Sequence, residues 1–443
     1  MPPISDILLL LRKSLPFFLR ILLRGTFNRL LTVHHNLTYN TTSSPKTVLV
    51  IGGSFAGLQT VRRLTQTLPS GYRVLWIEKN SHLNYCFAFP RFSVVSGLEG
   101  KAFIPYTGVE EGAVQGILER VQGKVVAVEK GRVKLEAEGQ NGWWMDVDWT
   151  YLVIATGSSS SLPVRLAATE REGGCEELRG VQDVIKHSAR IAVVGAGAVG
   201  VELASDVKEF FPEKDVTLFH SRGEVLSRFG PRLRKYALGA LEGLGVKVLL
   251  NERPDIPGHG SMARDAVLEL KDGRKEKYDL VINCTGQTPN SSLISSMCPG
   301  SISKSTSQIL VHPTLQIITP DQPSSSVAAN ETPIFALGDV AAHPGPLMAR
   351  AGFMQAEIVV SNILSMIKGN PAKAEYKPDW FIEGAIKLTL GKTHNVVYSR
   401  DEGEHGAEVL LPSQKGTLDL DVGRAWREFG VDIQMAEGRE KDD

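Results

Sequence analysis

The pattern of apolar and polar residues predicts a strand–turn–helix–strand unit near the start of the chain. Residues 47–51 form a continuous apolar run of strand length, and residues 52–57, Gly-Gly-Ser-Phe-Ala-Gly, follow directly. Apolar residues then recur every three or four positions as far as Leu68, and a second apolar run at residues 73–77 ends in Glu78. Such a period indicates a helix, whereas short apolar runs bounded by glycines indicate buried strands.

The same unit recurs in the middle of the chain. Residues 190–194, Arg-Ile-Ala-Val-Val, lead into residues 195–200, Gly-Ala-Gly-Ala-Val-Gly, which precede a helical pattern and a strand at residues 216–219. Glycine-rich turns between a strand and a helix are typical of dinucleotide sites. Two of them indicate two dinucleotides in one protein, and the usual pair that exchanges a hydride is a nicotinamide and a flavin.

The first glycine turn has the residue types that a dinucleotide site needs. Glycines let the backbone touch a pyrophosphate, and the N-terminus of the following helix supplies partial positive charge. Glu78 follows at the distance from the turn where an acid binds both ribose hydroxyls. Ser54 stands where a second glycine is usual, with Gly53 beside it. The candidate binding residues are Gly52, Gly53, Ser54, Phe55, Ala56, Gly57, Glu78 and Lys79.

The second turn differs at the position that selects between NADH and NADPH. Gly195, Gly197 and Gly200 are all in place, but His220, Ser221 and Arg222 stand where an acid would select NADH. An acid repels a 2′-phosphate, whereas Arg222 attracts one. Two interpretations stay open: Arg222 makes NADPH a donor beside or instead of NADH, or it is a solvated loop cation.

The first 45 residues read as an attachment to the fold. Residues 4–31 are rich in leucine and carry one acid, Asp6. Their basic residues are Arg12, Lys13, Arg20, Arg24 and Arg29. The uncharged stretches are shorter than the roughly 20 residues of a bilayer span, and a proline at position 16 would kink a helix. We expect an amphipathic helix in a membrane interface or an organelle-targeting peptide, or else a helix packed on the protein's own surface. Residues 40–45 read as a linker.

Composition excludes several function classes. The 443 residues are 42% hydrophobic and 22% charged, as in an ordinary globular protein. Lysine plus arginine equals aspartate plus glutamate at 49 each, so no net field draws the chain to nucleic acid, and we expect no nucleic-acid partner. Four cysteines without a C-x-x-C pair, and scattered histidines, predict neither a disulfide framework nor a metal site.

Four further segments complete a resemblance to the two-dinucleotide flavoprotein superfamily with the glutathione-reductase-like fold. They are residues 151–157, 279–286, 334–339 and 351–356, and they occur in the superfamily's order. The chain is most similar to apoptosis-inducing-factor-like flavoproteins of the ferroptosis-suppressor type, with type II NADH dehydrogenases nearby. Residues 84–91, 199–203 and 380–392 carry that closer likeness.

The resemblance implies an α/β fold with two Rossmann-like domains, one for FAD and one for NAD(P), plus a small C-terminal β-containing segment. The implied domains are an attachment segment with linker (1–45), an FAD domain (46–165, resumed at 310–375), an NAD(P)H domain (166–309) and a C-terminal segment with a disordered tail (376–443). It also implies cofactor contacts from Arg91, Ala155, Thr156, Gly157, Thr285, Gly286, Gly338, Asp339 and Gln355.

Glu202 is the candidate catalytic residue. It lies one turn into the second nucleotide-binding helix, where the resemblance implies a carboxylate close to the nicotinamide or the flavin. The alternative is a helix-face charge near the positive N-terminus of that helix. Hydride transfer between the cofactors needs no nucleophile or metal.

The sequence thus predicts an FAD-dependent NAD(P)H oxidoreductase that passes electrons to a small quinone-like acceptor. The attachment segment predicts a membrane-associated protein, mitochondrial or on the cytoplasmic face of an organelle membrane. Two other functions stay open: a redox-sensing signalling protein that holds both dinucleotides, and a ferredoxin or rubredoxin reductase. The oligomeric state stays open as well.

Overall fold

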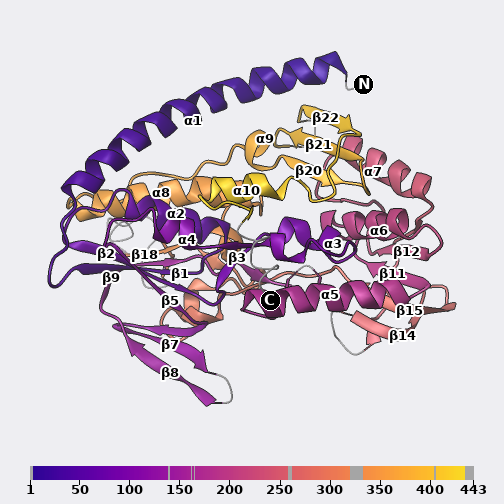
Figure 1. Ribbon diagram of the computed structural model, residues 1–443, viewed down its shortest axis with the longest axis horizontal. Helices are drawn as coiled ribbons and strands as arrows, with labels where there is room; N and C mark the ends of the chain where they lie inside the picture. Colours follow the sequence, from indigo (N-terminus) through magenta and orange to yellow (C-terminus); the bar gives the residue numbers. More distant parts are fainter. Residues whose placement is uncertain are drawn as a thin grey trace.

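Two sheet-centred domains lie side by side in the computed structural model, and a long N-terminal helix runs across one edge of both (Figure 1). The structure describes residues 3–137, 140–160, 162–163, 165–257, 262–319, 333–403 and 406–434. The expected tail beyond residue 434 lies outside the described residues.

The first domain is built on a five-stranded parallel sheet in the order β18-β9-β1-β2-β5. Its strands are β1 (Lys46–Ile51), β2 (Tyr72–Glu78), β5 (Leu118–Gln122), β9 (Trp149–Ile154) and β18 (Ile334–Ala336). Helices α2 (Phe55–Thr65) and α8 (Ala349–Ile367) share one core with alternate residues of β1, among them Val48 and Val50. Leu49 and Ile51 face a second core on the other side. Both faces are therefore covered, as a parallel sheet requires.

Smaller elements extend this domain. An antiparallel sheet of β6 (Val125–Glu129), β7 (Arg132–Ala137) and β8 (Gln140–Asp146) projects from one end (Figure 1). The remaining short elements are β3 (His82–Asn84), α3 (Phe89–Phe92), β4 (Phe103–Pro105), α4 (Thr107–Glu110), β10 (Ser158–Ser159), β16 (Thr288–Pro289), β17 (Ile309–Leu310) and β19 (Ala341–Ala342). Strands β10 and β16 pair where the chain enters and leaves the second domain.

The second domain repeats the plan with the strand order β13-β12-β11-β15-β14, in which only β14 is antiparallel. Its strands are β11 (Arg190–Val194), β12 (Asp215–His220), β13 (Lys247–Leu250), β14 (Met262–Glu269) and β15 (Lys275–Asn283). Its helices are α5 (Arg171–His187), α6 (Ala198–Phe210) and α7 (Pro231–Leu244). The second domain is thus inserted between β9 and β18 of the first, in the predicted order, while the exact limits stay predictions.

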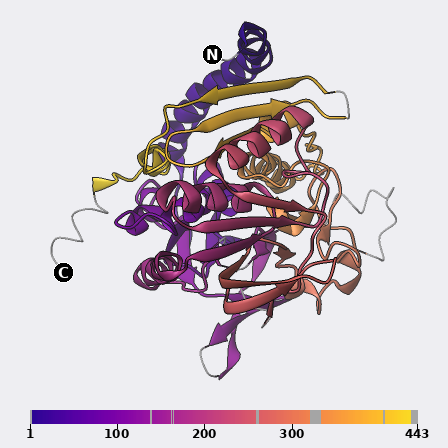
Figure 2. The ribbon, with the colours of Figure 1, turned by 90° about the vertical axis from the view of Figure 1, so that its right-hand side faces the viewer.

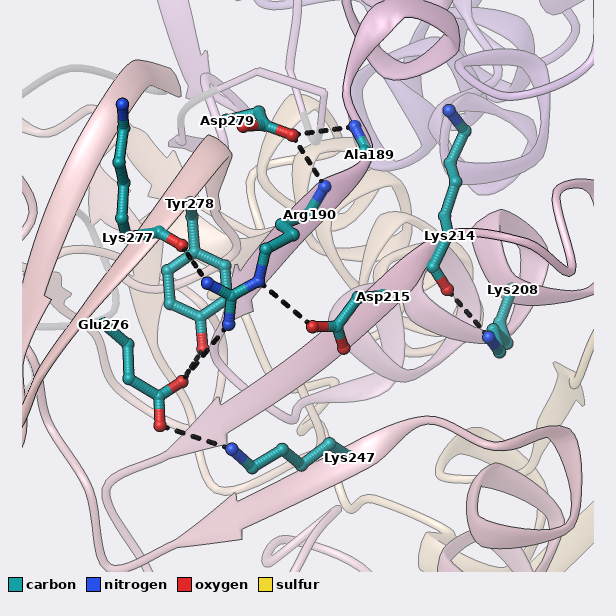
Figure 3. A network of polar contacts seen from close by, with 10 residues as sticks. All are labelled: Ala189, Arg190, Lys208, Lys214, Asp215, Lys247, Glu276, Lys277, Tyr278 and Asp279. Carbon is teal, nitrogen blue, oxygen red and sulfur yellow. Dashed lines mark hydrogen bonds and ion pairs between the residues drawn. The ribbon is translucent and has the colours of Figure 1, made fainter.

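A polar network fixes the amino ends of the second sheet (Figure 3). The Arg190 guanidinium donates to the Lys277 carbonyl at 2.7 Å and to Asp215 at 3.1 Å, and it stacks on the Tyr278 ring. Asp279 accepts hydrogen bonds from the backbone N–H groups of Ala189 and Arg190, both at 2.8 Å. These contacts align the amino ends of β11, β12 and β15, so the carboxyl ends are left for a ligand.

The C-terminal segment forms a small antiparallel sheet over the second domain. It comprises α9 (Trp380–Glu383), β20 (Ile386–Thr389), β21 (Asn395–Arg400), β22 (Glu408–Ser413) and α10 (Val422–Glu428). Leu388 and Val396 belong to the same core as α6 and α7. Figure 2 shows these strands between the second domain and the N-terminal helix. Residues 380–392, which carry part of the family likeness, start with the helical turn α9, capped by the Asp379 side chain, and continue into β20.

The N-terminal helix α1 (Ile4–Thr38) is longer than expected and continues through Pro16. Its apolar residues Leu9, Leu10 and Phe17 pack on a core cluster beneath α9 and β22. Lys13 pairs with Asp401 at 2.9 Å and Asp6 pairs with Arg232 at 2.6 Å. Pro16 therefore does not end the helix, and residues on both sides of it pack on the same cluster.

Candidate functional site

The first glycine turn is a tight backbone cradle. Gly52 has φ +103°, and a Cβ there would overlap the Ala155 carbonyl. A Cβ on Gly57 would overlap the Gly52 carbonyl oxygen, and one on Gly53 would enter the Trp76 ring. The glycine found one position early in this turn is therefore required by packing against Trp76. Ser54 is the residue before α2, and the N-terminus of that helix faces the cradle.

Glu78 closes this cradle from the end of β2. Its carboxylate accepts hydrogen bonds from the Gly53 N–H and, at 2.8 Å, from the Asn80 N–H. Burial raises the pKa of this carboxyl group, against the lowering effect of the two N–H groups. The acid therefore lies beside the turn, where a ribose would follow the pyrophosphate. Lys79, next in the chain, is half-buried, and burial lowers its pKa.

The residues implied by the resemblance converge on the same region. Thr156 donates its hydroxyl hydrogen to the Asn290 carbonyl at 2.8 Å, and Ser158 donates to Asp339 at 3.1 Å. The Gln355 side-chain oxygen accepts from the Gly338 N–H at 2.7 Å. A Cβ on Gly338 would lie 3.3 Å from the Ala56 methyl group, at the first turn of α2. Segments far apart in the sequence thus surround one site at the carboxyl ends of β1, β9 and β18.

The second glycine turn borders a cavity of about 1550 Å³. Gly195 has φ +113°, and a Cβ on Gly200 would overlap the Gly195 carbonyl. By contrast, a Cβ on Gly197 would meet no atom within 4 Å, so the space above this residue is free. The predicted residues that line the cavity are Gly195, Gly197, Arg222, Thr285, Gly286 and Asp339. One cavity therefore contacts the second cradle and the late motif of the first domain.

Glu202 lies under the C-terminal sheet. Its carboxylate accepts hydrogen bonds from the Thr389 backbone N–H at 3.1 Å and from the Thr389 hydroxyl at 3.2 Å. Desolvation raises the pKa of Glu202 to about 8, and the neighbouring Asp206 adds to the rise. This carboxyl group is thus held between α6 and β20, and its contact with a cofactor stays a prediction.

Arg91 forms a buried ion pair with Asp206. The side chain is 1% exposed, and its Nε lies 2.8 Å from Asp206. Its Nη2 donates to the Gly391 carbonyl at 2.5 Å. The guanidinium therefore joins α3 to α6 and to the turn between β20 and β21. The cofactor contact implied for Arg91 stays a prediction, and the contacts that the structure shows are structural.

Sequence reasoning missed two sets of residues near the site. Aromatic rings of Tyr85, Phe87 and Phe353 cluster around the predicted residue Phe55, and Phe87 is 49% exposed. Residues 84–91 carry a likeness to a family, and the spacing of their aromatic residues is the sequence signal that indicates this cluster. The second set lines the cavity from the C-terminal segment, for example Tyr398 and Arg400, where no motif marks them.

The two cradles fit the dinucleotides predicted for them. The first cradle combines glycines, a helix N-terminus, an acid and Asp339, which are the groups that FAD needs. The second offers open space at Gly197 and a continuous cavity toward Asp339. When bound, FAD supplies the redox chemistry, and the protein supplies position and electrostatics.

Comparison with known proteins agrees with this arrangement. Residues 46–358 match the pyridine nucleotide-disulphide oxidoreductase family. The chain is 35% identical over 410 residues to Fe-regulated protein 8 of Mycosarcoma maydis, covering 87% of this chain and 95% of that protein. It is 26% identical over 386 residues to ferroptosis suppressor protein 1 of Homo sapiens, covering 86% and 95% of the two chains.

Solved structures share the fold. The sulfide:quinone oxidoreductase of Aquifex aeolicus superposes with a TM-score of 0.65 at 15% identity, covering 87% of this chain and 90% of that one. The water-forming NADH oxidase of Lactobacillus brevis, bound to NADH, gives 0.60 at 17% identity over 80% and 75%. The α/β fold with two dinucleotide domains, the FAD and NAD(P)H cofactors and the oxidoreductase class are thereby confirmed. The chain belongs to the pyridine nucleotide-disulphide oxidoreductase family.

Proposed function

We propose that this protein transfers electrons from NAD(P)H, through FAD, to a quinone-like acceptor at a membrane surface. The observation that carries the proposal is the single cavity that joins the second glycine cradle to Asp339. Residues from both domains and from the C-terminal segment line it, so a nicotinamide held by the second cradle can reach the flavin region. Holding both rings in one orientation supplies much of the rate advantage of hydride transfer.

The cysteines favour a diffusing acceptor over a protein disulfide. All four are free, and Cys86 stands alone in the region of the first domain where disulfide reductases of this fold carry a pair. Burial raises the pKa of Cys86 and raises that of Cys284 to about 12, so both stay protonated thiols. The lining of the cavity includes Leu347, Met348 and Trp380, an apolar edge suited to the planar ring of a quinone.

Helix α1 supports the membrane part of the proposal. No helix among the described residues is long and apolar enough to cross a bilayer. The exposed large apolar side chains of α1 are Ile4, Ile7, Leu8, Leu11, Leu15, Phe18, Leu19, Ile21, Leu22, Leu23, Phe27, Leu30, Leu31, Val33 and Leu37. A patch of this size on a helix already docked by its other face fits a membrane interface. We propose that the helix holds the protein on an organelle membrane, either in mitochondria or on the cytoplasmic side.

The basic residues of α1 are divided between the protein and the exposed surface. Lys13 pairs with Asp401 and so faces the protein, whereas Arg12, Arg20 and Arg29 are exposed. The side chain of Arg24 lies outside the described part of the chain. We therefore expect apolar burial and the attraction of the exposed arginines to anionic lipid to act together in binding.

Turnover tests the redox part. The purified protein should carry flavin that NADH or NADPH bleaches under anaerobic conditions, and a short-chain ubiquinone analogue should then restore the oxidised spectrum over many cycles. A long-lived charge-transfer complex without turnover would favour the signalling function. Reoxidation by ferredoxin or rubredoxin but not by the quinone would favour the protein-reductase function.

Flotation with vesicles of phosphatidylcholine and phosphatidylserine tests the membrane part. We expect the wild type to float, and the triple variant Leu11→Ser, Leu15→Ser, Phe18→Ser to stay in solution with its flavin reduction intact. Val267 and Leu418 are about as exposed but lie outside α1, so Val267→Ser with Leu418→Ser is the matched control. Equal flotation of the two variants contradicts the proposal.

A further inference from the structure

In both nucleotide-binding units, a side chain at the end of the second strand accepts a hydrogen bond from the backbone of the glycine turn. The type of side chain differs between the two units. At the end of β2, the Glu78 carboxylate accepts a hydrogen bond from the second residue of the glycine turn, Gly53. At the end of β12, His220 Nδ1 accepts one from the corresponding residue, Ala196, at 3.2 Å. The histidine therefore occupies the position of the ribose-binding acid.

His220 presents a donor where Glu78 presents an acceptor. Because Nδ1 accepts from the Ala196 N–H, the proton of the neutral ring is on Nε2. That nitrogen is buried and has no hydrogen-bond partner among the described residues. Burial and the nearby Arg222 lower the pKa of His220, so the ring carries no charge at neutral pH. A neutral N–H donor accommodates an anion that a carboxylate would repel.

Arginines line the cavity beside this histidine. Arg222 follows two positions after His220, and Arg253 follows the end of β13, on a loop that donates from the Asn251 N–H to the Arg222 carbonyl at 3.1 Å. Arg222 Nη1 donates to the Ser227 hydroxyl at 2.6 Å, which fixes the direction of the guanidinium. No ion pair of Arg222 or Arg253 is found among the described residues.

Acidic groups on the same wall leave this positive charge uncancelled. Glu252 and Asp255 line the cavity here, and both keep their negative charge, because Glu252 accepts only from the neutral Lys271 N–H at 3.0 Å. Arg228 lines the cavity together with Arg222 and Arg253, so three arginines outnumber these two acids. A planar, permanently charged guanidinium suits a phosphate group better than a ribose hydroxyl.

We propose that this corner of the cavity binds the 2′-phosphate of NADPH, with Arg222 as the main specificity-determining residue and His220 and Arg253 beside it. NADPH is then preferred over NADH. This inference rests on the proposed function, because it names the electron donor of the same site.

Binding of two small probes tests the inference without turnover. The FAD-loaded protein is titrated calorimetrically with 2′,5′-ADP and with 5′-AMP, which differ by the 2′-phosphate. We expect 2′,5′-ADP to bind at least about tenfold more tightly, as a charge-assisted contact provides. Arg222→Ala should remove most of that ratio, and Arg222→Lys should keep part of it, because charge remains without the fork geometry.

The matched control is Arg179→Ala, since Arg179 is an exposed arginine on α5 that does not line the cavity. It should leave the ratio unchanged at the same ionic strength. The anaerobic rates of flavin reduction by NADPH and NADH should follow the binding ratio through the series. Equal binding of both probes by the wild type, or a ratio that Arg222→Ala leaves intact, overturns the inference. Failure of either nucleotide to bleach the flavin would instead refute the proposed function, while the probe ratio would still report on the phosphate site.

Discussion

The two nucleotide-binding units share a backbone and differ in what surrounds it. In the first unit, the protein's own side chains close the cradle. Glu78 accepts a hydrogen bond from the Gly53 N–H of the glycine turn, and Ser158 donates one to Asp339. In the second, the cradle opens onto a cavity of about 1550 Å³, bordered by Arg222 and Arg253. The fold thus sets how a pyrophosphate is held, while the residues just past each second strand set which ligand is accepted. A tightly held cofactor and an exchangeable donor follow from the same architecture.

The largest expected effect concerns the pairing that joins the two units. Arg91→Ala leaves the buried Asp206 carboxyl group without its partner, which should cost about 3–5 kcal/mol of unfolding free energy. Chemical denaturation of the variant measures this loss. If Arg91 instead binds the cofactor, flavin content will fall at a denaturant concentration where the fold is intact. Arg73, whose side chain is 35% exposed and pairs with Glu119, gives the control Arg73→Ala with a loss below about 1 kcal/mol.

Substituting alanine for the closely packed glycine in either turn should distinguish the function of one nucleotide-binding unit from that of the other. Gly57→Ala and Gly200→Ala each place a Cβ against a backbone carbonyl, so each should lose about 1–3 kcal/mol of stability. Gly57→Ala should also lose flavin on desalting. Gly200→Ala should retain flavin but resist reduction by NAD(P)H. Thermal unfolding and flavin content per chain measure both effects, and identical behaviour of the two variants would contradict the assignment of one cofactor to each unit.

Glu202 gives a pH dependence whose sign follows from burial. Its pKa in the folded protein, about 8, lies above the ordinary value of 4.5, so the folded state binds more protons between these pH values. Unfolding free energy should therefore fall as pH rises from about 5 to about 8. Asp206, raised to about 6, adds to the fall at the lower end. Glu202→Gln, which resembles the protonated form, should flatten the upper part of the profile, and an unchanged slope would show that Glu202 does not titrate there.

Local patterns predicted the cradles well, because each is built from residues adjacent in sequence. The run 47–51 and the run ending at Glu78 became β1 and β2, and both glycine turns lie where expected. Such local patterns do not predict contacts between residues that are far apart in the sequence. Arg91 meets Asp206 across 115 residues, and Asp6 accepts from Leu410 across 404. Periodicity carries no information about pairs so distant, so a role for Arg91 came only from likeness to a family.

Helix α1 is a second case in which local sequence patterns do not predict the tertiary contacts. Proline removes a backbone donor and crowds the preceding turn, which predicts that a helix kinks or restarts at Pro16. The helix continues through this residue, and Leu9, Leu10 and Phe17, which lie on both sides of it, pack on Phe381 and its neighbours. These contacts involve the C-terminal sheet, so the pattern of residues 4–31 alone does not predict them.

The smallest expected effect on stability is at Gly197, and it isolates the ligand from the fold. A Cβ there meets no protein atom within 4 Å, unlike the Cβ of Gly200→Ala in the same turn. Alanine is less favourable than glycine at the position before α6, but it also makes the unfolded chain less flexible. Because these two effects oppose each other, Gly197→Ala should change the unfolding free energy by less than about 0.5 kcal/mol. The methyl group should nevertheless fill space needed by the donor's pyrophosphate and raise KM for NAD(P)H with flavin content unchanged. A fall in Tm as large as that of Gly200→Ala would show that the second cradle is closed by the protein after all, and the contrast between the two units would then disappear.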